Sequence, residues 1–576
     1  MLRSLLIAGC LAALVAAPGA GAQAQELVPG LTFERQVQFT THGPVAINVL
    51  TGPRPGGLWS FAPVLSNDAL PGTEKLTALE QRLAPAATVA GISGDLFNAQ
   101  TGSPSGLLMR GGGLEHFPLR ERSSGGLDGA GNLLVSRVQL IATWQGSGQR
   151  RPFTVLNDAL QGNGIALYTP AYGPAAPTGA VSAVLEPFPG LQPSGTPSGP
   201  VTQVVQNAPA PIPPDGAVLV ARGAGAAAAL AAEAPAGTTV TVRPVLKPDW
   251  SGVVSGFGGG PLLVRGGRAV FRANEAFTTD QLLLRTARAA IGQLKDGRLV
   301  LVAVDGGRPG YSTGMSNFEL AQTMVRLGAD TALALGGGSQ VSLAFAGGLL
   351  NTPPGAEAPI SEALLFEYAG VYAPPPLEAV LSPNGDGIAE KEELSYTLVR
   401  PSTVSATLVG PDAVPRFSFS GPAQPGTFPL EFTGIKPDGT PDLEGVYKWT
   451  INATDDLGRV SSIERDFSLD NTLGFAKPVG PTLGVPRPSP RVVATMTLTH
   501  PATVATRIET PAGVLVRNLG SLNLQPGAVD IAWDGVADTG AVVYSGRFVA
   551  HATATNELGV VDLSVPFAVR RVAGRG

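Results

Sequence analysis

The chain has 576 residues and a net charge of −5, and only 14% of its residues are charged. A weakly acidic chain with so few charges lacks the basic surface that polyanions require, so we expect no nucleic-acid partner. Its 75 glycines and 52 prolines separate many short apolar runs, which is typical of a loop-rich protein with many strands. The length predicts three or four domains.

Residues 1–24 have the pattern of a secretory signal peptide. A positive start precedes the apolar run Leu5–Ala17, and Ala22–Ala24 is a small-x-small cleavage site, so the mature protein should begin near Gln25. The only cysteine, Cys10, also fits a lipoprotein box, but lipidation there would leave an apolar stretch on the mature end. The pattern favours a secreted or extracytoplasmic bacterial protein of the cell envelope, because its mature chain has no disulfides. No later segment is long and apolar enough to cross a membrane.

A strand followed by a helix is predicted near the middle of the chain. Leu299–Val304 is a short, continuous apolar run of the kind that forms a strand buried on both faces, and Asp305 stands at its carboxyl end. The helix should begin after Ser316, because Glu319 completes a capping box with it. Gly328 should end this helix.

A second strand, Thr331–Leu335, runs into the glycines Gly336–Gly338. Glycines have no side chains to block a ligand, so their amides could face an anion. The two strands and the helix therefore predict a helix packed on a sheet, with a site beside it.

Four ordered segments resemble the phosphodiester glycosidase family. They are GISGDLFNAQTGSPSG (91–106), GFGGGPLLVRGG (256–267), RAAIG (288–292) with VDGGRPGYSTGMS (304–316), and ALALGGGSQVSLAFAGGLLN (332–351). The family includes N-acetylglucosamine-1-phosphodiester α-N-acetylglucosaminidase, and the similarity spans roughly Leu27 to Tyr368. The resemblance implies an α+β catalytic-type domain over residues 25–372, with a mixed β-sheet and packed helices.

The resemblance also implies the site. Cleaving a sugar from a phosphodiester requires a cation or amides on the phosphate and a carboxyl group that moves a proton or takes the anomeric carbon. Arg288 could hold the phosphate through its planar fork, and Asp95 and Asp305 supply the carboxylates. The predicted substrate-binding residues are Ser93, Gly259, Gly260, Gly337, Gly338 and Ser339. The expected partner is a glycan or sugar-phosphodiester substrate, at the cell envelope or outside the cell.

Three positions depart from the family pattern. Gly336 stands where the family usually has an aspartate, Ser93 where it has an asparagine, and Ala289 where it has a threonine. Two hypotheses therefore stand side by side. The protein is an exported hydrolase that cleaves a glycosyl phosphodiester, or it is a catalytically impaired relative that binds carbohydrate or serves as an envelope scaffold.

Two other catalytic or binding motifs match short stretches of the chain, but the residues that they would need elsewhere are missing or lie in other modules. Residues 310–314 fit the G-x-S-x-G nucleophile elbow, but the histidines downstream lie in other modules. Residues 223–228 fit a dinucleotide fingerprint, but no acid follows at the required distance, so a tight strand-to-helix turn is the better interpretation. The chain has no HExxH and no Cys-x-x-Cys, so we expect neither a cofactor nor a metal at the site.

The last third of the chain contains a repeat. YTLVRPSTVSATL (396–408) aligns with MTLTHPATVATRI (496–508), and EGVYKWTINATDDLG (444–458) aligns with SGRFVAHATATNELG (545–559). Both copies alternate apolar and polar residues, which predicts two all-β immunoglobulin-like sandwiches over residues 377–472 and 488–572. They resemble the modules of flagellar hook-capping proteins.

One loop in the first repeat carries oxygens of the kind that calcium takes. It comprises Asn384 and Asp386, followed by Glu390 and two further acids. Asn-Gly-Asp-Gly is also a common turn, and the spacing differs from the twelve-residue calcium loop. A structural turn is therefore favoured over a calcium site.

Overall fold

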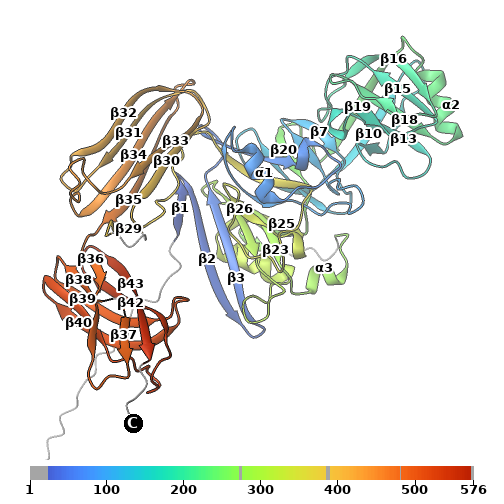
Figure 1. The fold of residues 1–576 in the computed structure, drawn as a ribbon. Helices are drawn as coiled ribbons and strands as arrows, with labels where there is room; N and C mark the ends of the chain where they lie inside the picture. Colours follow the sequence, from blue (N-terminus) through green and yellow to red (C-terminus); the bar gives the residue numbers. More distant parts are fainter. Residues whose placement is uncertain (1–23, 271–274, 385–388, 481, 572–576) are drawn as a thin grey trace, which may run out of the picture. The chain divides into compact units, whose positions relative to one another are not determined.

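The computed structural model describes residues 24–270, 275–384, 389–480 and 482–571 (Figure 1). The chain divides into two compact units, and the boundary lies between Tyr368 and Ala369. The predicted signal peptide lies outside the described residues, apart from Ala24. Within the described part, no helix is both long and apolar enough to span a bilayer.

The predicted α+β architecture with packed helices is wrong. Strands account for 52% of the structure and helices for 8%. The described residues contain four α-helices, α1 (Leu76–Leu83), α2 (Ala224–Glu233), α3 (Thr279–Leu283) and α4 (Asn317–Arg326). The well-patterned helix after Asp305 is one of few, because glycines and prolines break most of the remaining chain into short strands that pair with each other.

The sheet that carries most of the predicted site is antiparallel throughout. In spatial order its strands are β1 (Gln25–Val28), β2 (Leu31–Thr40), β3 (Gly43–Gly52), β24 (Leu299–Val304), β23 (Arg288–Leu294), β25 (Ala329–Gly337), β21 (Leu262–Arg265) and β22 (Arg268–Ala269). The predicted strand Leu299–Val304 is confirmed, and its six residues are all buried.

Two five-stranded sheets bring distant segments to the same place. One contains β27 (Gly348–Leu349), β26 (Leu343–Phe345), β5 (Thr88–Ser93), β28 (Glu362–Tyr368) and β4 (Trp59–Leu65). The other contains β7 (Gly113–His116), β6 (Leu108–Arg110), β20 (Val253–Phe257), β8 (Ser123–Asp128) and β9 (Leu133–Arg137). The loops that follow β5 and β20 carry the first two family-like motifs, so the two sheets juxtapose them.

The remaining strands of the first unit form another eight-stranded sheet and a separate pair of two-residue strands. The sheet consists of β11 (Arg151–Pro152), β10 (Gln139–Gln145), β19 (Thr239–Lys247), β16 (Ser198–Gln206), β15 (Val181–Leu185), β18 (Ala217–Arg222), β13 (Gly164–Tyr168) and β12 (Val155–Leu156). The pair is β14 (Ala175–Ala176) and β17 (Ala210–Pro211). Gly223, at φ 84°, connects β18 directly to α2, which confirms the predicted strand-to-helix turn.

Helix α4 packs on the site-bearing sheet as predicted. Ser316 and Glu319 form the capping box, in which the Ser316 hydroxyl accepts from the Glu319 amide and the Glu319 carboxylate accepts from the Ser316 amide. Leu320 and Met324 are fully buried in one core with strand residues such as Val302. This core fixes the sheet from which Arg288 and Asp305 project.

The second unit consists of two β modules, each with two sheets around its own apolar core. In the first module, one sheet has the strands β29 (Val380–Leu381), β35 (Val460–Leu469), β34 (Gly445–Asp455), β31 (Ser402–Val409) and β32 (Pro415–Ala423). The other sheet has β30 (Glu392–Leu398) and β33 (Gly426–Phe432). In the second module, one sheet has the strands β36 (Leu473–Pro478), β38 (Arg491–Leu498) and β41 (Gly527–Trp533). The other sheet has β37 (Thr482–Val485), β43 (Val560–Arg571), β42 (Gly546–Thr555), β39 (Ala502–Glu509) and β40 (Leu515–Leu524).

The sequence repeat corresponds to equivalent strands of the two modules. Strands β30, β31, β33 and β34 of the first module correspond to β38, β39, β41 and β42 of the second. Tyr447 and its counterpart Phe548 both lie in the module cores. The proposed calcium loop falls largely on residues 385–388, which lie outside the described part of the chain.

Candidate functional site

Asp95 lies just after β5, in a pocket of backbone from three segments. Its carboxylate is buried, and Oδ1 accepts a hydrogen bond from Nη2 of Arg122 at 2.5 Å. A Cβ at Gly106 would lie 2.7 Å from Oδ2 and a Cβ at Gly258 would lie 2.3 Å from it. These glycines are therefore needed because the chain approaches the carboxylate too closely for any side chain.

Glu362, the first residue of β28, is a second carboxyl beside Asp95. Its Oε1 accepts the Asp95 amide at 3.3 Å, and the side chain is almost completely buried. Neither Oε2 of Glu362 nor Oδ2 of Asp95 has a hydrogen-bond partner among the described residues. Burial first, and the charge of Asp95 second, raise the pKa of Glu362 to about 8. The pair therefore holds a proton at neutral pH.

Arg288 lies at the start of β23 and is also buried. Its Nε donates to the carbonyl of Met315 at 3.0 Å and its Nη2 donates to the carbonyl of Leu284 at 2.7 Å. No acidic side chain within the described residues pairs with it. Burial lowers the pKa of the guanidinium to about 10, so Arg288 remains a cation at neutral pH without a charged partner.

A cavity of about 460 Å³, here called the arginine pocket, opens beside Arg288. Residues 277–288, which include helix α3 and the start of β23, supply most of its wall, and β25 adds Leu335 and Gly337. Its glycine lining is Gly260, Gly337 and Gly338, and its apolar lining is Leu96, Phe277, Leu284 and Leu335. The predicted guanidinium and three of the predicted glycines therefore meet at one cavity.

The glycines shape the pocket by their lack of side chains. The amide of Gly260 donates to the carbonyl of Ala334 and that of Gly338 donates to the carbonyl of Ala287, so neither amide faces a ligand. A Cβ at Gly337 would lie 3.5 Å from Nη1 of Arg288. Gly337 therefore lies beside this nitrogen, at ordinary van der Waals distance.

The other predicted substrate-binding residues lie around this pocket without lining it. The Ser93 hydroxyl accepts the amide of Ser342 at 3.2 Å and thus ties β5 to the segment after η3 (Gly338–Gln340). Gly259 packs against Leu333, where a Cβ would come within 2.6 Å of a side-chain carbon. Ser339 is exposed. Ser93 and Gly259 thus support neighbouring segments, and none of the three residues lines the cavity.

Asp305 occupies a different environment from the one its motif suggests. It is fully buried at the end of β24. Its carboxylate accepts hydrogen bonds from the side chains of Asn48, Tyr311 and Asn351 and from the amide of Thr352, at 2.8–3.1 Å. All of its acceptor capacity is thus used to join β3, β24 and the 351–352 segment. The structure does not bring Asp305 to the arginine pocket.

A second cavity, here called the neighbouring cleft, adjoins the arginine pocket. The two share Leu96, Phe277 and Gln281 in their linings. Outside this shared part the cleft has five polar or charged lining residues, Ser105, Arg120, Glu121, Arg122 and Gln340, and three apolar ones, Phe97, Leu119 and Ala276. The guanidinium of Arg122 lies 4.5 Å from the centre of the Phe277 ring, so this arginine connects the cleft with the buried Asp95.

Sequence reasoning missed Arg122 and Glu362. Neither lies in a motif with recognisable spacing, and both reach Asp95 only because β28 pairs with β5 and because the loop before β8 returns to it. The one available signal was the buried glutamate that opens the apolar run Glu362–Tyr368. An acid inside an otherwise apolar strand is costly to bury and so indicates a partner.

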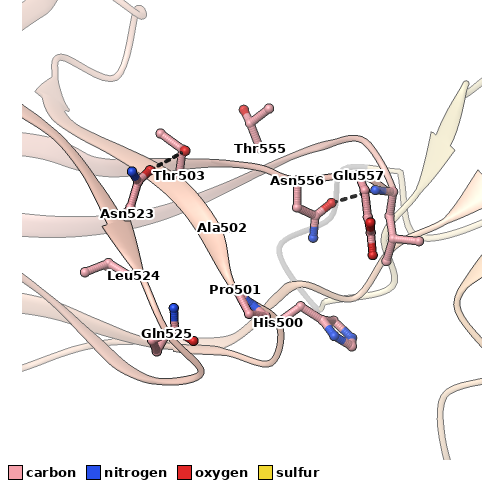
Figure 2. Close-up of a pocket in the computed structure, with 11 residues that line it drawn as sticks. His500, Pro501, Ala502, Thr503, Asn523, Leu524, Gln525, Thr555, Asn556 and Glu557 are labelled. Atoms are coloured by element: carbon pink, nitrogen blue, oxygen red, sulfur yellow. Dashed lines mark hydrogen bonds between the residues drawn. The ribbon is translucent and has the colours of Figure 1, made fainter.

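Another cavity of about 460 Å³ lies at one end of the second β module (Figure 2). Exposed turns supply its walls, with amide and hydroxyl side chains such as Asn523, Gln525 and Thr555. Thr503 donates to Asn523 across it at 2.6 Å. It contains no buried cation and no carboxyl pair among the described residues, so it has none of the features of the first-unit site.

Comparison with known proteins supports the family interpretation for the first unit. Residues 195–367 match the family model described as phosphodiester glycosidase. This segment contains Arg288, Gly337 and Glu362 but not Asp95 or Arg122. No curated protein sequence matches the chain.

Three solved structures are similar to part of the chain. A hypothetical protein from Synechocystis is 29% identical, with a TM-score of 0.51, over 61% of this chain and 64% of that protein, just under two thirds of its length. A putative exported protein from Burkholderia pseudomallei is 21% identical, with a TM-score of 0.46, over 56% and 74% of the two chains. The catalytic domain of zebrafish N-acetylglucosamine-1-phosphodiester α-N-acetylglucosaminidase is 13% identical, with a TM-score of 0.33, over 60% and 87%. At the level of the family, the match of residues 195–367 supports a phosphodiester glycosidase-type hydrolase.

Proposed function

We propose that this protein is an exported hydrolase that cleaves a sugar from a phosphodiester. The reaction adds water across the bond between the anomeric carbon and the phosphate oxygen, which yields a free sugar and a phosphomonoester. The family match of residues 195–367 supports the reaction class. The sugar is taken to be part of an envelope or extracellular glycan.

The observation that carries this proposal is the unpaired guanidinium of Arg288. A buried cation without a carboxylate partner is destabilising for the free protein, since burial removes its hydration. A bound phosphodiester carries one negative charge and would supply the missing partner. Arg288 is held in position by the carbonyls of Met315 and Leu284, so its remaining nitrogen, Nη1, is pre-oriented for the anion.

The carboxyl pair would supply the acid. Glu362 holds a proton beside Asp95 at neutral pH, because its pKa is raised. The guanidinium of Arg122 connects Asp95 to the neighbouring cleft. A sugar phosphodiester that draws Arg122 toward itself would release the Asp95 carboxyl for proton transfer. Substrate binding and activation of the acid are thus coupled through one guanidinium.

Export rests on the sequence of residues 1–24. A positive start, a short apolar run and the small-x-small site at Ala22–Ala24 are the parts of a cleavable signal. We infer an extracytoplasmic location at the cell envelope, where the two β modules of the second unit would act as spacers. N-terminal sequencing of the mature protein, and fractionation of cells that express the full chain, test this location.

A second function is favoured by one specific observation. The Asp95 side chain is only 1% exposed and is paired with Arg122, and Gly336 supplies no replacement acid. A protein with this arrangement can bind a sugar phosphodiester at Arg288 without cleaving it. In this case the chain is a carbohydrate-phosphate binding protein on the same fold.

Hydrolysis of hexose 1-(4-nitrophenyl phosphate) esters distinguishes the two functions. Cleavage at the sugar gives 4-nitrophenyl phosphate, which added phosphatase converts to coloured nitrophenol. The hydrolase predicts turnover that is lost in Arg288→Gln and Asp95→Asn. Arg298→Gln is the matched control, because Arg298 lies at the exposed turn of the same β23–β24 hairpin and pairs only locally with Asp296. Binding by calorimetry without product supports the binding protein, and neither binding nor turnover contradicts both.

A further inference from the structure

Most polar side chains that line the arginine pocket are already committed to the fold. Gln281 accepts the amide of Thr278 in the capping box of α3. Arg285 pairs with Glu319 and also donates to the carbonyl of Gly314 at 2.9 Å. A ligand in this pocket therefore meets few free hydrogen-bonding groups on these side chains.

Asn317, Asp280 and Thr286 complete the polar lining. The Asn317 amide nitrogen donates to the carbonyl of Gln281 at 3.1 Å, which leaves its Oδ1 as a buried acceptor without a partner. Asp280 is exposed at the first turn of α3. Apart from these, the guanidinium of Arg288 is the main polar group offered to a ligand, and it is suited to an anion.

The rest of the pocket wall is apolar. Leu96, Phe277, Leu284 and Leu335 line it, and Leu284 is 57% exposed, although it is large and apolar. Leu283, the preceding residue, is 59% exposed. Leucines left in water next to a cavity cost free energy that an apolar ligand would recover. The neighbouring cleft also has apolar lining residues, Phe97, Leu119 and Ala276, but it adds two arginines, a glutamate, a serine and a glutamine.

We propose that the phosphodiester bound here carries a sugar on one side and an alkyl or isoprenoid chain on the other, with the chain lying in the arginine pocket along Leu96, Phe277 and Leu284. This inference rests on the proposed function, because it takes Arg288 as the phosphate-binding group. The sugar, rich in hydroxyl groups, lies against the charged and polar side chains of the neighbouring cleft. The phosphate lies at Arg288 in the arginine pocket, and the apolar wall selects the other ester group.

Short alkyl phosphates test this inference without knowledge of the sugar. Calorimetry on the full chain compares methyl phosphate, n-octyl phosphate below its aggregation concentration, and n-octanol. Each buried methylene contributes about 0.8 kcal/mol, so burial of only two of the seven extra methylenes would make octyl phosphate bind about tenfold more tightly than methyl phosphate. Octanol, which lacks the anion, should bind more weakly than octyl phosphate.

Two leucines of the same segment provide a matched pair of variants. Leu284→Gln should remove most of the octyl preference, whereas Leu283→Gln should leave it unchanged, because Leu283 is equally exposed but does not line the pocket. Both side chains are on the surface, so both variants should fold. Arg288→Lys keeps the charge but loses the fork, and should weaken both phosphates by a similar factor.

The outcomes separate this inference from the proposed function. Equal binding of methyl and octyl phosphate, weakened for both by Arg288→Lys, overturns the apolar ester group but leaves the phosphate site intact. Binding of neither phosphate overturns both. If octyl phosphate and octanol bind equally well and Arg288→Lys has no effect, the pocket binds apolar chains without an anion, which also overturns the inference. The inference is overturned as well if sedimentation shows a dimer without ligand and Leu284→Gln dissociates it, because the leucines then serve self-association.

Discussion

Replacing Glu362 with glutamine should stabilise the first unit at alkaline pH and have little effect at acid pH. The folded protein holds the pKa of Glu362 at about 8, against an ordinary value of 4.5, because the carboxyl is buried beside Asp95. Below pH 4.5 the group is protonated in both the folded and the unfolded chain, so its stabilising contribution is fully present. As the pH rises toward 8, unfolding releases this proton, and the contribution is lost.

The magnitude follows from the difference between the two pKa values. Each unit corresponds to about 1.4 kcal/mol, so a difference of 8 − 4.5 = 3.5 units corresponds to a loss on the order of 5 kcal/mol above pH 8. Glutamine does not ionise, and its amide can donate to Oδ2 of Asp95, which otherwise has no partner among the described residues. The free energy of unfolding of Glu362→Gln should therefore fall much less between pH 5 and pH 8.5.

Urea unfolding is followed by pulsed hydrogen exchange and mass spectrometry of individual peptides. The unfolding of the peptide that contains β28 can then be measured separately from that of the second unit. Glu367→Gln is the matched control, since Glu367 lies on the same strand, is less buried and bonds to Ser60. Burial also raises the pKa of Glu80 and of Glu115, so the wild-type slope has at least three sources and the difference between variants isolates Glu362. Parallel pH profiles for the wild type and Glu362→Gln would show that the carboxyl pair holds no proton at neutral pH and would refute the reasoning.

Three further substitutions test the packing around the site. Asp305→Asn should lower the free energy of unfolding by about 1–3 kcal/mol for each donor left without an acceptor, measured by the same urea unfolding, while phosphate binding at Arg288 persists in the folded protein. Gly258→Ala should cost roughly 1–3 kcal/mol and disturb the Asp95–Arg122 pair, because its Cβ would lie 2.3 Å from Oδ2; unchanged stability would contradict this close approach. Gly336→Asp should be destabilised without gaining turnover of the nitrophenyl ester, because its Cβ would lie 3.0 Å from the Gly94 carbonyl and 3.5 Å from the Asp95 carbonyl. A gain of turnover would show that the missing acid alone limits activity.

Local patterns in the sequence predicted local structure well. The strand Leu299–Val304, the Ser316 capping box and the repeated modules all depend on residues close together in the chain or on a period that can be read directly. The overall class expected for the first unit was wrong, because the resemblance implied packed helices, whereas most of the structure consists of short paired strands. Many short strands pair over long sequence distances, and no local pattern specifies those pairings.

The site was predicted only in part, for a similar reason. Arg288 and the glycines at 337 and 338 meet at one cavity because β23 and β25 are neighbours, which the ordered motifs anticipated. Asp305 ends a buried strand as predicted, yet hydrogen bonds from three segments occupy its carboxylate. A sequence shows where an acid stands on its strand, but the donors that surround it come from the tertiary fold.

The buried charges of the first unit explain why the site should bind an anion. The buried acids Asp95 and Asp305 each have strong donors, from Arg122 in the first case and from amides and a phenol in the second. Within the described residues, the buried cation Arg288 has only carbonyl acceptors. An anion that binds there removes a penalty present in the free protein, and binding to the folded state alone raises stability by mass action. The same uncompensated charge that weakens the empty protein therefore makes the pocket selective for a phosphate ester over a neutral sugar.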